Sequence, residues 1–325
     1  MSDSSSANNV HVISGRRGYG LFLTLLACTL WGLFPIAVKS VLLELDPYTI
    51  SFYRFVFSSA VLLPFLYSRR QLKGIYQIGN TRLRLTLLAC GSLLIGNYLF
   101  YTFGVRHITP EATQVIIQLA TVLMLVSSVF LFGENFSRLQ WLGCAIFMCG
   151  LVIFFYHRII VMLDGLNTYA LGMGLITLAA ITWTSYAILQ KQLLIHFTSS
   201  QVMIVVYILG IIAFLPFSRP GDITSLSSVN IALLIFCAAS TLLGAGSFAE
   251  ALAHLEASKV SAMMATLPIF TLAFMWGLSF FPWFNIVAEP MSATTLLGAV
   301  VVVSGALMVA LKRADNNQEA AISES

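Results

Sequence analysis

The sequence feature that most limits the fold is a series of long apolar runs separated by short polar breaks. Segments such as residues 87–103 and 115–132 are apolar on nearly every side of a helix. A bilayer is crossed by about 20 apolar residues in helical form, because lipid offers no partner to an unpaired backbone group. The strands of a membrane barrel would instead alternate with a period of two over about 10 residues. We therefore expect an all-α integral membrane protein.

The composition supports a lipid-facing surface. Hydrophobic residues make up 58% of the chain and charged residues only 9%, whereas soluble domains are about 25% charged. No water-facing exterior can be built from so few charges.

Polar residues divide the apolar runs into ten predicted transmembrane helices. Three boundaries carry helix-start chemistry: Asp46 before Pro47, Thr109 before Pro110, and a capping-box pattern at 137–140. The predicted spans are residues 19–38, 48–67, 84–104, 111–132, 138–156, 169–190, 200–217, 229–249, 258–280 and 292–311.

The distribution of Lys and Arg predicts the orientation. Placing the N-terminus inside puts most of the 17 basic residues on the cytoplasmic side, where positive charge is retained. Both termini are then cytoplasmic, with a disordered tail at 1–18 and a second tail at 313–325. The net charge of +4 is a topology signal, and we expect no nucleic-acid partner.

The two halves of the chain show an internal repeat. Residues 19–157 and 168–312 each hold five spans, and because five is odd, the second half enters the membrane from the opposite side. Such inverted repeats are a transporter architecture, since they can open a central site to either side in turn. The matched residues are Trp31, Lys39, His107, Glu134, Gly143 and Gly150 with Trp183, Lys191, His254, Glu289, Gly298 and Gly305.

The start and end of the first half resemble a known family. Residues 31–39 (WGLFPIAVK), followed by Asp46-Pro47 and Arg54, are similar to the opening of an EamA-type repeat of the drug/metabolite transporter superfamily. Phe132-Gly133-Glu134 is similar to its close. The second half matches less well and has no arginine corresponding to Arg54.

This resemblance implies a secondary transporter of the bacterial inner (plasma) membrane. The family moves small organic metabolites or drugs, often as exporters, by alternating access with proton or exchange coupling. Its partners would be the small-molecule substrate and the lipid bilayer, and the protein could act as a monomer or a homodimer.

Arg54 is the first candidate for a substrate-binding residue. It lies about 9 Å into its span, where an isolated arginine costs about 2.5 kcal/mol or more. It either attracts an anionic substrate group or a carboxylate, or reaches the outer headgroups. Other polar and aromatic residues that we expect to face a central cavity, or to join helices, are Trp31, Asn97, Tyr101, Gln114, Gln118, Trp183 and Tyr186.

Three further residues are candidates for coupling or gating. Lys39 ends the first span and is alternatively an interfacial anchor. Glu250 follows a helix rich in small residues and is alternatively a solvated helix end. Pro268, ten residues into the ninth span, predicts a bend beside the cavity or a simple packing kink.

An intramembrane enzyme or a channel without a recognisable motif is the alternative function. The chain contains no His-Glu-x-x-His zinc motif and no nucleotide-binding P-loop. All five cysteines lie in apolar runs without metal-ligand spacing. We therefore expect no enzymatic activity, no metal and no cofactor.

Overall fold

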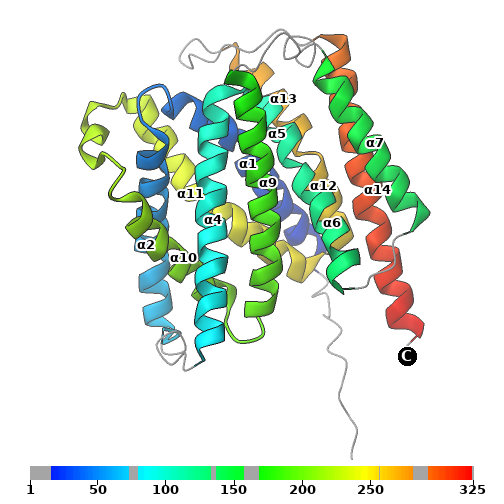
Figure 1. The fold of residues 1–325 in the computed structure, drawn as a ribbon, viewed down its shortest axis with the longest axis horizontal. Helices are drawn as coiled ribbons and strands as arrows, with labels where there is room; N and C mark the ends of the chain where they lie inside the picture. The colour runs from blue at the N-terminus through cyan, green and yellow to red at the C-terminus, as the bar shows by residue number, and fades with distance from the viewer. Residues whose placement is uncertain are drawn as a thin grey trace, which may run out of the picture.

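Helices make up nearly all of the chain in the computed structural model, which describes residues 16–72, 80–132, 137–156, 168–255, 257–280 and 292–323 (Figure 1). The α-helices and the one 3₁₀ helix, η1, are α1 (Arg17–Val41), α2 (Pro47–Ser68), α4 (Thr81–His107), α5 (Pro110–Ile117), α6 (Leu119–Phe132), α7 (Arg138–Phe154), α9 (Thr168–Leu193), α10 (Ser199–Phe214), η1 (Pro220–Ser225), α11 (Ser228–His254), α12 (Ala257–Ala265), α13 (Leu267–Leu278) and α14 (Ala293–Ser323).

The predicted helix starts are present. The Asp46 carboxylate accepts hydrogen bonds from the backbone N–H of Tyr48 (2.9 Å) and Thr49 (3.1 Å) at the start of α2. Ser137 and Gln140 form the predicted capping box of α7. These caps satisfy N–H groups that the first helical turn cannot pair.

The predicted fourth and ninth spans are each interrupted, where the sequence indicated one continuous helix and one bend. The first breaks at Gln118, between α5 and α6, and the second breaks at Thr266, between α12 and α13. In the second, Pro268 lacks the N–H that would bond the Met264 carbonyl. The Ile269 N–H meanwhile bonds Thr266 O (2.9 Å) in place of the Ala265 carbonyl.

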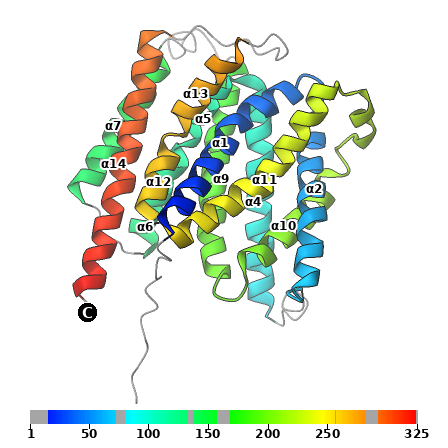
Figure 2. The same cartoon turned by 180° about the vertical axis from the view of Figure 1, so that it is seen from behind.

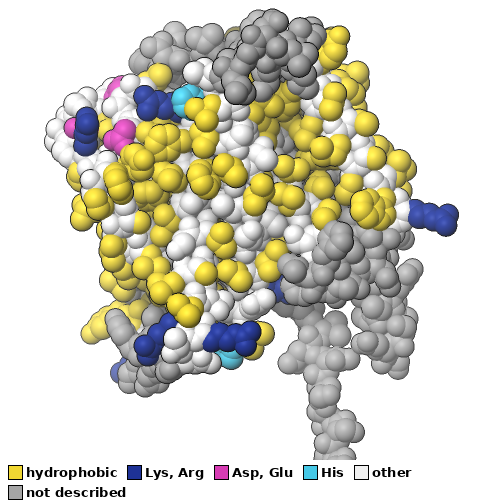
Figure 3. Space-filling model, in the orientation of Figure 1, with side chains coloured by type: hydrophobic (Ala, Val, Ile, Leu, Met, Phe, Trp, Pro, Cys, Tyr) yellow, Lys and Arg dark blue, Asp and Glu magenta, His cyan; other side chains and the backbone are white. Residues whose placement is uncertain are grey.

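The outer surface is that of an integral membrane protein. Five helices are long and apolar enough to cross a bilayer, namely α1, α2, α4, α9 and the Ser228–Ala251 part of α11. Hydrophobic side chains cover much of the middle of the face in Figure 3, while most Lys and Arg side chains lie toward its two ends and one projects from the right-hand edge. This belt is the distribution that lipid in the middle and water at both ends require.

Each half packs mainly against the other half. Helix α1 lies along α11, α4 along α9, α2 against α10, and α7 along α14 (Figures 1 and 2). Glycines let α7 and α14 approach closely: a Cβ on Gly298 would meet the Phe154 backbone, and one on Gly150 the Val302 backbone.

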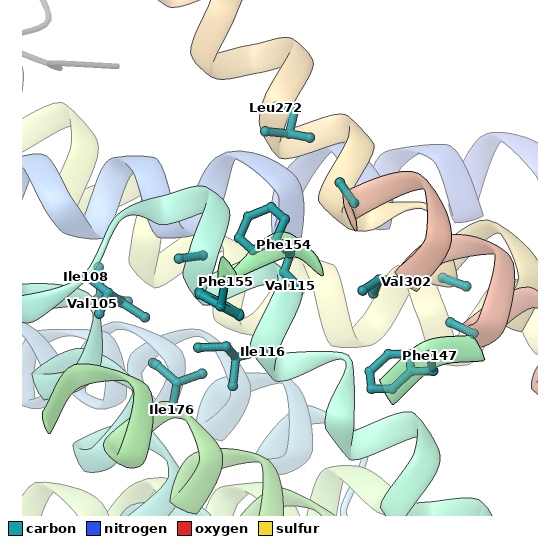
Figure 4. Packing of buried hydrophobic residues seen from close by; sticks show 14 of the residues in the cluster. Val105, Ile108, Val115, Ile116, Phe147, Phe154, Phe155, Ile176, Leu272 and Val302 are labelled. Atoms are coloured by element: carbon teal, nitrogen blue, oxygen red, sulfur yellow. The ribbon is translucent and has the colours of Figure 1, made fainter. Parts of the chain in front are cut away.

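The largest buried cluster joins helices from both halves (Figure 4). It includes Val105 of α4, Ile116 of α5, Phe147 of α7, Ile176 of α9 and Val302 of α14, all less than 5% exposed. This packing holds the interrupted helices between α4, α9 and α14.

The described chain begins and ends at the same end of the bundle (Figures 1 and 2). Two predicted tails differ in extent: α1 already includes residues 17–18, and α14 continues to Ser323, where a tail was predicted. Residues 1–15 and the repeat-matched Glu134 and Glu289 lie outside the described residues.

Candidate functional site

Arg54 lies inside the bundle, held between two aromatic rings. Its guanidinium carbon is 4.3 Å from the ring centre of Phe34 (α1) and 4.2 Å from that of Tyr98 (α4). Its Nε donates a hydrogen bond to Thr241 Oγ1 (α11) at 3.0 Å. The residue is 5% exposed, so the arginine does not reach the headgroups, which was the alternative interpretation.

The charge of Arg54 is not balanced by a carboxylate in the described part of the chain. Two cation–π contacts offset part of the cost of burial, because ring faces carry partial negative charge. Thr241 is held by its own hydrogen bond to the Cys237 carbonyl (2.9 Å). A buried cation with neutral neighbours strongly favours an incoming negative group.

Buried serine hydroxyls lie close in sequence to Arg54 or to its partner Thr241. Ser51 and Ser58 are three residues before and four residues after Arg54, so they lie on the same side of α2. Ser240 precedes Thr241 on α11. The hydroxyl oxygens of Ser51 and Ser240 are buried without a hydrogen bond to any described residue, and the Ser58 hydroxyl lies beside that of Tyr207. Lipid-buried polar groups normally find partners, so these hydroxyls mark this region as polar beyond what packing requires.

Two predicted site residues pack against helices that contribute to the Arg54 site. The Tyr101 ring lies 5.6 Å from the Phe34 ring. Trp31 packs against Gly244, where any Cβ would collide with the indole, and its ring lies 5.8 Å from that of Phe248. Tyr101 therefore contacts a ring that packs on Arg54, whereas Trp31 packs between α1 and α11.

Gln118 joins the two helix interruptions. Its Nε2 donates to the carbonyls of Met264 (3.1 Å) and Ala265 (3.5 Å) at the end of α12. These are the carbonyls left without intrahelical donors by the break before Pro268. Gln114 lies one turn earlier on α5 and is buried without a hydrogen bond to any described residue.

Three predicted site residues lie on the α4–α9–α10 side. Asn97 donates to the Ala179 carbonyl of α9 (2.8 Å), which is a helix-to-helix contact. The Tyr186 hydroxyl lies 3.2 Å from Met203 Sδ of α10. Trp183 is 39% exposed on α9. No contact to Arg54 is recorded for any of the three among the described residues.

Lys39 and Glu250 both have partners. Lys39 Nζ donates to the carbonyls of Val105 (2.8 Å), Arg106 (2.9 Å) and Ile108 (2.9 Å), so it fastens α1 to the end of α4. Glu250 lies 3.2 Å from His254 Nε2, one turn later on α11, with its side chain 58% exposed. Pro268 lies in the first turn of α13.

The sequence analysis did not identify Phe34 or Thr241 as site residues. The signal for Phe34 was available, because it lies in the motif that also contains Trp31 and a buried arginine needs ring faces nearby. Thr241 carried no such signal, since threonines occur throughout the spans. The described residues contain no cluster of His, Cys, Asp and Glu that could hold a metal ion.

Comparison with known proteins identifies relatives across nearly the whole chain. The model of the EamA-like transporter family matches residues 18–156 and 170–311. The "Uncharacterized inner membrane transporter YhbE" of Escherichia coli K12 is 37% identical over 295 residues, covering 90% of this chain and 92% of the relative. The "Probable amino-acid metabolite efflux pump" of Salmonella typhimurium LT2 is 24% identical over 299 residues, covering 87% and 92%.

A solved crystal structure has the same fold. It superimposes with a TM-score of 0.62 at 17% identity and covers 92% of this chain and 97% of its own. At that identity the likeness concerns the fold alone.

Proposed function

The chain belongs to the EamA-like transporter family, and we propose that it is a secondary transporter that exports small organic metabolites or drugs. The observation that carries this proposal is the buried Arg54, which contacts three helices at the junction of the two halves. Phe34 and Tyr98 come from the first half and Thr241 from the second. A solute bound there would contact both halves, as alternating access requires.

The proposed mechanism is a rocking of two inverted five-helix halves around this site. The helix pairs support this proposal. In the order of the spans, α1, α2, α4 and α7 of the first half correspond to α9, α10, α11 and α14 of the second half. The contact of α1 with α11 then corresponds to that of α9 with α4, while α2 packs on its own counterpart α10 and α7 on its own counterpart α14. The common end of the first and last described helices also agrees with an even number of crossings (Figure 2). We propose that this end is cytoplasmic.

The interrupted helices are the proposed moving parts. Carbonyls freed at the end of α12 are bonded by a side chain, Gln118 Nε2, and not by backbone. A side-chain bond can be exchanged during a conformational change more easily than a helical backbone ladder. The breaks at Gln118 and Thr266 would then act as hinges.

We propose coupling to protons or to a counter-solute. Among the candidates for coupling, Glu250 with His254 is a titratable pair close to the first turn of α1, where the Tyr19 and His254 rings are 5.1 Å apart. This position suits proton exchange at the cytoplasmic end. Lys39, which holds three carbonyls of α4, has the role of a fastener between helices.

Transport is tested with purified protein in liposomes. A thermal-shift panel of carboxylates, amino acids, nucleosides, sugars and cationic drugs identifies a ligand, and trans-stimulated exchange of the labelled ligand measures transport. We expect Arg54→Gln to reduce exchange at least tenfold and Arg106→Gln, on the exposed end of α4, to leave it unchanged. Exchange unaffected by Arg54→Gln would remove Arg54 from the site.

Topology is tested separately by cysteine labelling in intact cells. Single cysteines at residues 5 and 320 should both be protected from an impermeant reagent until the membrane is opened. Labelling of only one terminus would contradict the inverted arrangement.

A further inference from the structure

We propose that the solute bound at Arg54 is a monoanionic carboxylate with an apolar body, held by the guanidinium N–H groups. This assignment rests on the proposed transport function and names the substrate class of that same site.

The neighbours of Arg54 limit how a ligand can approach it. Its guanidinium carbon lies over the ring of Phe34 at 4.3 Å and over the ring of Tyr98 at 4.2 Å. The Nε side is taken by Thr241. Tyr98 also forms a side-chain hydrogen bond with Arg54, and no carboxylate in the described ranges pairs with the guanidinium. An incoming anion would therefore pair with the guanidinium N–H groups that Thr241 and Tyr98 leave free.

Guanidinium N–H groups match a carboxylate. Two parallel N–H groups in one plane pair with the two oxygens of a carboxylate, and this bidentate contact is both directional and strong. The rings of Phe34 and Tyr98 and the hydrogen bond to Thr241 hold the guanidinium in place before a ligand arrives.

The local charge selects a single negative charge. The three side chains in recorded contact with Arg54 are Phe34, Tyr98 and Thr241, and none carries a negative charge. One carboxylate neutralises the site. A dianion would leave surplus charge in an apolar interior, and the ammonium of a zwitterionic amino acid would find no carboxylate among these contacts.

The rest of the surroundings suits an apolar body. Tyr101 lies against Phe34, and Phe55 lies 4.7 Å from Tyr98, so rings continue away from the guanidinium. The cysteine Cys237, whose carbonyl holds Thr241, is fully buried. An aromatic or branched aliphatic carboxylate fits these surroundings better than a sugar acid with many hydroxyls.

The first test compares matched ligands on the unaltered protein. Purified protein in detergent is titrated with 3-phenylpropionate, its primary amide, phenylalanine and phenethylammonium, with the thermal midpoint as readout. We expect saturable stabilisation by the carboxylate and at least tenfold weaker binding of the other three. Equal binding of the amide or the amine, or no saturable shift from the carboxylate, would overturn the assignment.

The second test uses variants with the same carboxylate. Arg54→Gln should abolish the shift, Arg54→Lys should weaken binding at least tenfold because it keeps charge without the planar guanidinium, and Arg106→Gln should not change it. Wild-type affinity in Arg54→Gln would contradict the proposal. The ligand series on the unaltered protein decides the question even if Arg54→Gln does not fold.

Failure of the transport proposal and failure of the substrate-class proposal would give different experimental results. Exchange of a neutral or cationic solute, with no effect of carboxylates, would leave transport standing and reject the substrate class. Arg54-dependent carboxylate binding without trans-stimulated exchange would leave the binding site standing and reject transport.

Discussion

The two halves differ clearly at one buried position of their second helices. The N-terminal caps of these helices show which residues correspond. Asp46 caps α2 and Thr198 caps α10, and eight residues further on the first half has Arg54 where the second has Val206. Both are buried. Arg54 meets two rings and a hydroxyl, whereas Val206 belongs to an apolar cluster with Leu94 and other residues of α4 and α9.

The two halves that the family model matches therefore share a similar arrangement of helices but differ in their buried charge. Two matched helix pairs, α2 with α11 and α10 with α4, occupy corresponding places. Only one of them holds a buried cation. Under the proposed alternating access, a single charged site between the halves would open to each side of the membrane in turn, whereas two such sites would hold two ligands.

The largest expected effect comes from making the halves alike. Val206→Arg places a second cation in a fully apolar cluster and should destabilise the protein by about 3 kcal/mol or more, because the charge has no partner. The measurement is the thermal midpoint in detergent, with Val206→Met as a control for side-chain length. Wild-type stability of Val206→Arg would mean that the second half can also accept a charge.

A smaller effect is expected at the matched lysines. Lys39→Met removes charged hydrogen bonds to three carbonyls at the end of α4, which should cost about 2–3 kcal/mol. Lys191→Met, at the matched exposed position, should cost less. Chemical denaturation of both variants checks the order, and equal losses would contradict a specific fastening role for Lys39.

The two interruptions should respond differently to substitution. Gln118→Leu leaves the Met264 and Ala265 carbonyls without a donor and should cost about 1–2 kcal/mol. Adding Pro268→Ala restores an N–H four residues after Met264 and should recover part of the loss. Additive effects in this double-mutant cycle would show that Gln118 and the break are independent.

The smallest effect is expected in the loops before α2 and α10. Glu44 Oε2 accepts a hydrogen bond from the Ser227 N–H (2.9 Å), and this bond lowers the pKa of Glu44 from its usual 4.5. A lowered pKa stabilises the fold above the unfolded pKa, and the benefit is lost as pH falls through the folded pKa.

This prediction is tested by measuring the thermal midpoints of wild type and loop variants as a function of pH. Glu44→Gln should cost about 0.5 kcal/mol or less near pH 7, since the group is exposed, and the cost should vanish once the pH falls below the lowered pKa of Glu44, where the wild-type side chain is protonated too. His196→Gln, at the matched loop position, should show no such acid-range convergence. A difference in thermal midpoint between wild type and Glu44→Gln that stays the same in acid would contradict a stabilising role for the ionised Glu44 side chain.

Much of the fold could be predicted from the sequence, because membrane helices have strong local sequence signals. Long apolar runs identified the helices, and Asp46 and Ser137 identified starts that the structure confirms. The surroundings of Arg54 were harder to predict from the sequence. The sequence indicated that Arg54 needs a partner, but its partners Phe34, Tyr98 and Thr241 lie up to 187 residues away along the chain.

The sequence by itself determined that this chain lives in lipid, since a chain with 58% hydrophobic residues has no other stable solvent. It also placed a bend at Pro268, because proline cannot complete the helical hydrogen bonds there, although the structure has a full break at Thr266. Only the tertiary structure decided the break at Gln118, where no proline intervenes and the glutamine turns to carbonyls 146 residues away. It also decided that Arg54 is enclosed by rings, because packing between helices, unlike helix formation, depends on residues that are distant in the chain.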